Sequence, residues 1–110
     1  LDDWYRERAR DLFRKHMDRC FAKVSKYGIK QAPLRIQRMK SRWGSYTLAG
    51  TIILNLALIK TPIHCIDYVI THELCYTIEP HHGPAFENLL TKCLPDWRKR
   101  KKRLEQTIIT

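Results

Sequence analysis

The residue types with the clearest chemical meaning lie in the segment 72–76, which reads HELCY. In the zinc-hydrolase motif H-E-x-x-H, two histidines one helical turn apart bind a metal ion, and the glutamate activates a water molecule. His72 and Glu73 match this motif, but Tyr76 occupies the position of the second histidine. His82 follows at a spacing typical of a third metal ligand. The pattern predicts a metal-dependent hydrolase site in which one ligand position is altered.

The spacing of these residues places them around one point. A helix turns by about 100° per residue, so positions 72 and 76 share one face, with Glu73 beside them. Pro80 breaks the helix and allows the chain to return His82 to that point. Three protein ligands leave a position open for water, which is the arrangement of a catalytic metal site. A zinc ion lowers the pKa of its water from about 15.7 to about 7, and Glu73 is placed to accept the proton.

Tyr76 leaves three alternatives open at the altered position. A phenol has a pKa of about 10 and must lose its proton to bind a metal well. In the first, Tyr76 swings away and leaves a two-histidine site; in the second, it coordinates the metal as a phenolate. In the third, the neighbouring His81 or Glu79 takes over its place as a metal ligand. We expect weakened metal binding. The alternative interpretation is a chance His-Glu pair on a helix that binds no metal.

The composition is that of one globular domain. The 110 residues are 44% apolar and 29% charged, which suits a chain with a single hydrophobic core. No apolar segment is long enough to span a membrane, and the first residues do not resemble a signal peptide. The cysteines form no C-x-x-C pair, so we expect reduced thiols in the cytoplasm rather than disulfides or a cysteine zinc site. They are Cys20, Cys65, Cys75 and Cys93.

The formal net charge of +10 favours polyanionic partners. Six consecutive basic residues occupy positions 98–103. At helical spacing they surround most of a helix, so we interpret them first as a solvated terminal helix. Weak, salt-sensitive nucleic-acid binding is the alternative, and it would need these residues to share a face with Lys40 and Arg42.

Hydrophobic periodicity predicts the elements that position the motif. Apolar residues recur at three- and four-residue steps over residues 3–26, which indicates an N-terminal helix. Helical patterns also cover residues 62–76 and begin again near Pro84 and after Pro95. Short strands are predicted at residues 34–37, 43–47 and 51–58. Their short connections favour antiparallel hairpins, so we expect an α+β domain with a small three-stranded antiparallel sheet.

Further segments turn the isolated motif into a family pattern. They read RMKSRWGS at 38–45, ILN at 53–55 and DYVITHELC at 67–75, and they continue at positions 79–80, 82, 86 and 94–97. Together they resemble the YgjP-like metallopeptidases, relatives of the WLM and SprT-type zincins, over nearly the whole chain. The resemblance implies a minimal zincin-like fold over residues 1–110. It also implies that this domain is the C-terminal part of a longer protein.

The resemblance assigns roles to the motif. It implies that His72 and His82 bind the metal, that Glu73 is the catalytic base, and that position 76 should be a third ligand, because the family pattern reads H-E-L-C-H. The implied metal is zinc or another divalent transition metal such as nickel. Tyr76 departs from the pattern, which bears on metal affinity and activity but not on the fold.

The segment Trp43-Gly44-Ser45 is a candidate for substrate binding, because zincins hold a peptide against an edge strand. The alternative is ordinary core packing of Trp43, with Gly44 at a bulge. Asn55, at the end of a predicted strand, would either orient a metal ligand or form a turn.

Three functions are consistent with the sequence. The first is a zinc-dependent metallopeptidase that acts on a peptide or protein substrate through Glu73. The second is a nucleoside triphosphate (UTP) pyrophosphatase, an activity assigned within the YgjP-like group. The third is a catalytically degenerate zincin scaffold that lost its metal through Tyr76 and binds nucleic acid or protein.

Overall fold

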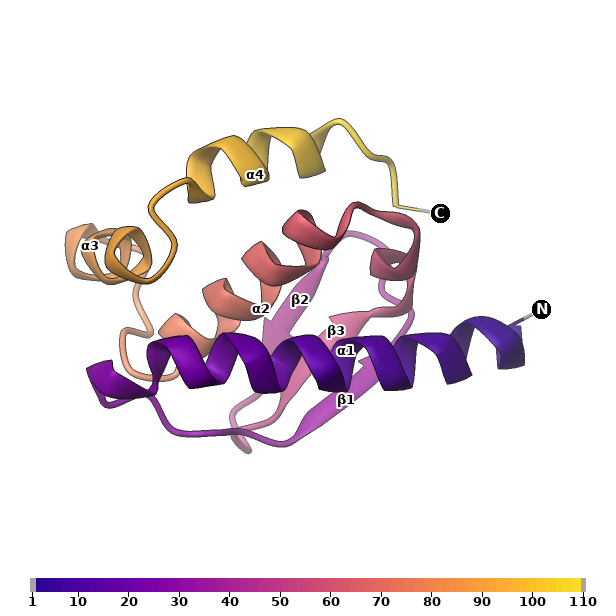
Figure 1. Cartoon of the computed structure of the whole chain (residues 1–110), viewed down its shortest axis with the longest axis horizontal. Coiled ribbons are helices and arrows are strands. Elements are labelled where there is room, and N and C mark those ends of the chain that lie inside the picture. The colour runs from indigo at the N-terminus through magenta and orange to yellow at the C-terminus, as the bar shows by residue number, and fades with distance from the viewer. Residues whose placement is uncertain (1, 110) are drawn as a thin grey trace.

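The computed structural model describes residues 2–109. Its elements follow the predicted order of a long helix, three short strands and further helices (Figure 1). The first helix, α1 (Asp2–Val24), packs its apolar stripe against the motif helix, α2 (Ile63–Tyr76). A 3₁₀ turn, η1 (Ser25–Tyr27), follows α1. It ends at Gly28, whose φ of 85° lies in the left-handed region that glycine adopts without strain.

The sheet has the order β1-β3-β2, and its pairing is mixed. Strand β2 (Gly44–Tyr46) is antiparallel to β3 (Ile52–Asn55), as predicted, but β1 (Leu34–Gln37) is parallel to β3. The prediction of a purely antiparallel sheet was therefore wrong. The connection 38–43 does not reverse into a hairpin beside β1. It crosses the end of β3 and places β2 on the opposite edge.

Asn55 explains both this crossing and the early end of β3. Its side-chain Nδ2 donates to the carbonyl oxygens of Met39 and Arg42, each at 2.8 Å, and so holds the connection in place. Its Oδ1 accepts the N–H of Ala57 at 3.0 Å and starts the 3₁₀ helix η2 (Leu56–Lys60) where the sequence predicted more strand. Of its two expected roles, the fully buried Asn55 performs the turn-forming one.

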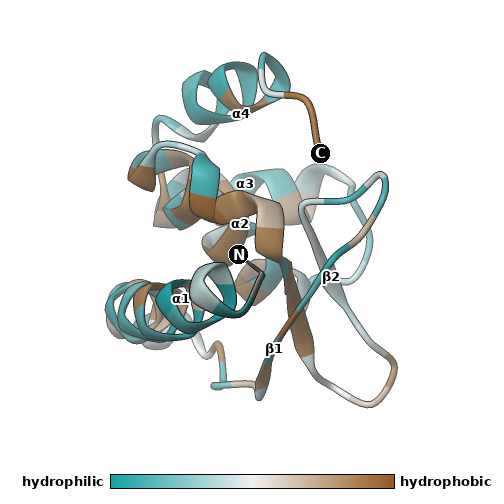
Figure 2. Cartoon of the chain, turned by 90° about the vertical axis from the view of Figure 1, so that its right-hand side faces the viewer, coloured by the Kyte–Doolittle hydropathy of each residue, from teal (hydrophilic) through white to brown (hydrophobic). Residues whose placement is uncertain are grey.

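Helix α2 is central to the molecule. It contacts α1, β2, β3 and the two C-terminal helices, α3 (Pro84–Cys93) and α4 (Trp97–Glu105). In Figure 1, α2 lies between α1 and α4. Figure 2 shows mostly hydrophobic residues on α2 and on the central strand β3, whereas the residues of α4 are mostly hydrophilic. No helix of residues 2–109 is long and apolar enough to cross a membrane.

The core holds the motif helix rigidly between its neighbours. Burying a large aliphatic or aromatic side chain contributes about 1.5–3 kcal/mol. Fully buried side chains come from α1, β3, α2 and α3, and they include Phe13, Met17, Leu54, Ile66, Ile70, Leu74 and Leu90. Three of the cysteines are also buried, and all four are free thiols.

Candidate metal centre

The structure brings the predicted chemical residues into one cleft of about 340 Å³. Helix α2 contributes His72, Glu73 and Tyr76 from its last turn, and the connection to α3 contributes His82. The opposite wall is the segment 42–46, which includes strand β2. Gly44 and Ser45 of the candidate substrate segment line this wall. His81 and Glu79 are not among the lining residues.

The turn that follows the end of α2 brings His82 back beside the helix. The N–H of Glu79 donates to the carbonyl of Cys75 at 3.0 Å, and a tight turn follows in which the N–H of Gly83 donates to the carbonyl of His81 at 2.7 Å. His82 then lies with its ring centroid 5.2 Å from that of His72 and 5.0 Å from that of Tyr76. The predicted convergence of these three side chains is therefore present.

Phe86 forms an apolar platform for the two histidines. This buried residue of α3 places its ring centroid 4.9 Å from that of His72 and 4.8 Å from that of His82. In the sequence, position 86 stood out only as part of the family pattern. The position of Phe86 in the first turn of α3, four residues after His82, is the signal that would have placed it near the site.

The spacing of the two imidazoles fits a shared metal ion. Imidazoles bound to one tetrahedral zinc at about 2.0–2.1 Å place their ring centroids about 5 Å apart, which agrees with the 5.2 Å found here. Within residues 2–109, no three histidine, cysteine, aspartate or glutamate side chains could hold a metal ion together. The donor set is therefore two imidazoles, with the phenol of Tyr76 where a third would stand. Imidazole suits zinc, copper, iron and nickel.

Glu73 is buried and lies against the first histidine. Its Oε2 is 3.1 Å from Nδ1 of His72. A carboxylate only accepts hydrogen bonds, so this contact holds the His72 proton on Nδ1 and leaves the Nε2 lone pair available to a metal. The arrangement fixes an imidazole and a carboxylate at adjacent positions.

Strand β2 approaches α2 so closely that only glycine fits at position 44. A Cβ built on Gly44 would lie 2.8 Å from Cγ1 of Val69 and 3.2 Å from both Cγ and Oε2 of Glu73. Glycine is therefore needed at position 44 because the backbone of β2 lies close to helix α2, and not because the strand has a bulge there. It allows the strand edge to lie beside the carboxylate.

Trp43 lines a second cavity of about 260 Å³ that shares Gly44, His72 and Glu73 with the cleft. Its other walls come from α2 and α4, where Tyr68, Val69 and Leu104 give it a mainly apolar surface. The charged residues Arg42, Lys101 and Glu105 also line it. Burial and, to a smaller extent, the nearby Glu105 and Glu73 carboxylates raise the pKa of Tyr68 from 10.0 to about 12. The Tyr68 phenol is therefore neutral at physiological pH, and Trp43 is both a packing residue and a cavity wall.

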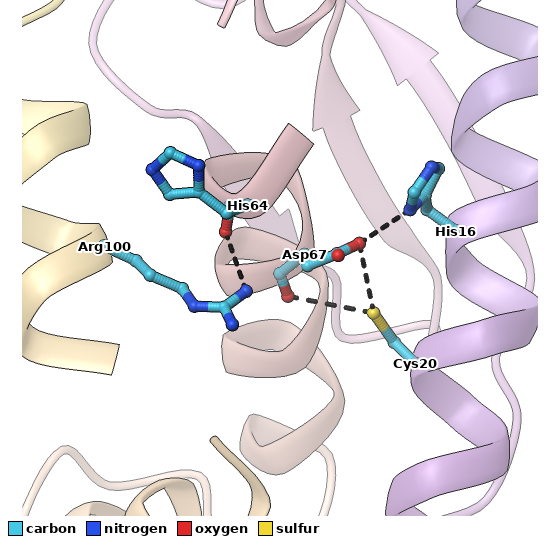
Figure 3. Close-up of polar contacts among 5 residues, drawn as sticks. All are labelled: His16, Cys20, His64, Asp67 and Arg100. Carbon is cyan, nitrogen blue, oxygen red and sulfur yellow. Dashed lines mark hydrogen bonds and ion pairs between the residues drawn. The ribbon is translucent and has the colours of Figure 1, made fainter. Parts of the chain in front are cut away.

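Polar contacts on two sides fix helix α2 (Figure 3). From α1, the buried His16 places Nδ1 2.8 Å from Oδ1 of Asp67, and the thiol of Cys20 lies 3.6 Å from the same oxygen. From α4, Arg100 donates to the carbonyl of His64 at 3.1 Å. Sequence reasoning missed Asp67, which lies five residues before His72. No local pattern marks a contact between residues so distant in the chain.

Comparisons with known proteins agree with this geometry. A family model described as YgjP-like, metallopeptidase domain, matches residues 1–107. The fold is similar to the metallopeptidase zymogen jannalysin of Methanocaldococcus jannaschii, with a TM-score of 0.70 and 19% identity over 86% of this chain and 94% of that one. It is also similar to the zymogen abylysin of Pyrococcus abyssi, with a TM-score of 0.74 and 18% identity over 89% and 99% of the two chains. At this identity the two structures establish the fold alone. No curated protein sequence matches the chain.

Proposed function

Because this chain belongs to the YgjP-like metallopeptidase domain family, as its motifs predicted, we propose that it hydrolyses peptide bonds with a divalent metal such as zinc held by His72 and His82. The observation that carries the proposal is the cleft in which both imidazoles and the Glu73 carboxylate face an open strand edge. Zincin chemistry needs these groups together.

The strand edge favours a peptide as the substrate. Strand β2 lies at one edge of the sheet. Trp43 and Thr47, which flank it, each form a backbone hydrogen bond of 2.9 Å with the segment that contains β3. Antiparallel pairing alternates, so Gly44 and Tyr46 direct their backbone N–H and C=O groups away from β3. Both residues line the cleft. An extended peptide placed there would bond to these groups as an added strand.

The cleft is less suited to binding a nucleoside triphosphate. Of the described residues that line the cleft, Arg42 is the one lysine or arginine. A triphosphate bound without a glycine-rich phosphate loop would need several cations to offset its charge. The composition of the cleft therefore supports peptide over nucleotide hydrolysis.

Glu73 supplies the proton transfers in the proposed reaction. A bound divalent metal would polarise the scissile carbonyl and acidify water. With Oε2 held by His72, Oε1 of Glu73 receives a proton from the attacking water and passes it to the departing amine nitrogen. Phe86 keeps the imidazoles in place by packing beneath them. The apolar cavity bounded by Trp43, Val69 and Leu104 would take an apolar side chain of the substrate.

The test is casein hydrolysis by zinc-supplemented protein, with UTP hydrolysis assayed in parallel. Glu73→Gln should abolish casein cleavage while zinc binding remains, because glutamine cannot accept the proton. Glu79→Gln is the matched control, since Glu79 lies near the cleft without lining it. Full casein turnover by Glu73→Gln would contradict the mechanism, and turnover of UTP alone would favour the pyrophosphatase.

The degenerate-scaffold function has one observation in its favour, which is Tyr76 in the cleft. Its ring packs edge-on against those of Tyr46, His82 and Phe86, with centroids 6.2, 5.0 and 6.3 Å away. A side chain held by aromatic packing in this way is stable without a metal. Failure of the protein to bind zinc would therefore favour the degenerate-scaffold function over the metallopeptidase.

A further inference from the structure

A cavity of about 560 Å³ lies between α1 and β1. Its lining residues are different from those of the candidate metal cleft and of the second cavity beside Trp43. Figure 1 shows β1 passing alongside α1. Four cations and one carboxylate line the cavity above two aliphatic side chains. The lining residues are Arg6, Arg10, Asp11, Arg14, Lys15, Leu34 and Ile36.

The three arginines form a row along one side of α1. They are spaced four residues apart, which is about 6 Å per step along a helix. Within residues 2–109, Arg6 and Arg10 have no ion pair or side-chain hydrogen bond, and Arg14 has only an exposed contact of 3.8 Å with Asp18. Like charges at this spacing repel one another, so the row is unfavourable without a counter-charge.

Strand β1 presents an unpaired edge next to this row. The N–H of Ile52 donates to the carbonyl of Pro33 at 2.9 Å, and the parallel register pairs Leu34 with Ile52. In this register the backbone groups of Leu34 and Ile36 point away from β3. No hydrogen bond within the described chain uses them. The same two residues line the cavity.

We propose that this cavity binds an acidic peptide segment in an extended conformation, added as a strand along β1. The backbone of the segment would bond to the outward groups of Leu34 and Ile36. Alternate residues of a strand are about 6.6 Å apart, which is close to the arginine step of about 6 Å. Carboxylates at every second position would therefore face Arg6, Arg10 and Arg14 in turn.

A nucleic-acid strand fits the same cavity less well. Single-stranded nucleic acid is bound by aromatic side chains that stack on bases, in addition to cations. No aromatic residue is among the described residues lining this cavity, and its floor is aliphatic. Unpaired backbone N–H and C=O groups on a strand edge are features that recognise a peptide.

Binding can be measured with a fluorescein-labelled peptide of alternating glutamate and valine. The double variant Arg6→Gln/Arg10→Gln should weaken binding at least about tenfold, because two charged hydrogen bonds to the peptide carboxylates are lost. The control is Lys99→Gln/Lys102→Gln, which removes the same charge from α4 outside this cavity and should leave affinity nearly unchanged. Circular dichroism of both variants checks the fold.

Backbone recognition is tested on the unaltered protein with two N-methylated peptides. Methylation of alternate residues blocks the N–H groups on one side of a strand, so one of the two peptides should lose binding and the other should keep it. The amide resonances of Leu34 and Ile36 should shift on titration.

Three results would overturn the proposal. Equal losses in the α1 and α4 variants would show general charge attraction. Equal binding of both methylated peptides would exclude strand addition. Binding of an oligothymidylate that depends on Arg6 and Arg10, without binding of the peptide, would assign the cavity to nucleic acid.

Discussion

The backbone of Gly44 on β2 lies against the side chain of Glu73 on α2, so closely that a methyl group at position 44 would come within 3.2 Å of Cγ and Oε2 of Glu73. This contact joins the proposed substrate edge to the proposed catalytic base. The position of one cannot change without moving the other.

Gly44→Ala should therefore impair activity more than folding. The new methyl group must displace Glu73 and Val69, and misplacing a catalytic group by about 1 Å costs on the order of 100-fold in rate. The strain would lower the free energy of unfolding by about 1–3 kcal/mol. Casein hydrolysis and urea unfolding measure the two effects.

Gly83→Ala is the matched control for this change. A Cβ at Gly83 meets no atom within 4 Å, and its φ of −110° suits any residue. Activity close to that of the unaltered protein is expected. If Gly44→Ala also kept full activity, the tight contact with Glu73 would have no catalytic importance.

The His16–Asp67 contact should stabilise α2 against α1. Asp67→Asn weakens a hydrogen bond to a buried imidazole and should reduce the free energy of unfolding by about 1–3 kcal/mol. The same substitution at Asp18, whose contact with Arg14 is exposed, should cost less than about 1 kcal/mol. Urea denaturation of the two variants compares them. Equal effects would mean that the buried pair has no special role.

Cys20 should make stability sensitive to alkaline pH. Burial, with the nearby Asp67 carboxylate, raises the pKa of this thiol from 9.0 to about 12. The thiol stays protonated in the folded state while it ionises in the unfolded state. Its contribution is therefore fully present below about pH 9 and is lost as the pH rises toward about 12.

Cys20→Ala tests this dependence. Free energies of unfolding measured from pH 8 upward should fall less steeply for Cys20→Ala than for the unaltered protein, because the variant lacks this titrating thiol. Cys93→Ala serves as the control, since hydrogen bonding from Cys75 lowers the pKa of Cys93. Parallel profiles for the unaltered protein and Cys20→Ala would contradict the assignment.

Local sequence patterns predicted the helices and the proximity of His72, Tyr76 and His82. The motif helix, its end near Tyr76, and the return of His82 after Pro80 all follow from periodicity and helix breaking within a short stretch of chain. The family pattern over residues 38–97 is also confirmed.

Features that depend on distant contacts were not predictable in this way. The parallel pairing of β1 arises because Asn55 holds the connection 38–43 across the end of β3. The contact between Asp67 and His16 joins residues 51 positions apart. Single-sequence periodicity describes which face of an element is buried, but not which partner covers it.

The proposed metal site is tested most directly by the zinc affinity of purified protein, measured by competition with a chromophoric chelator. We expect one zinc ion per chain, and His72→Ala and His82→Ala should each abolish binding. His81→Ala, at a histidine outside the cleft, should leave binding unchanged. Tyr76→His should tighten binding at least about tenfold, which corresponds to about 1.4 kcal/mol, because it supplies a third imidazole. Stoichiometric binding that survives His72→Ala or His82→Ala, or no binding by either the unaltered protein or Tyr76→His, would contradict a metal site at His72 and His82.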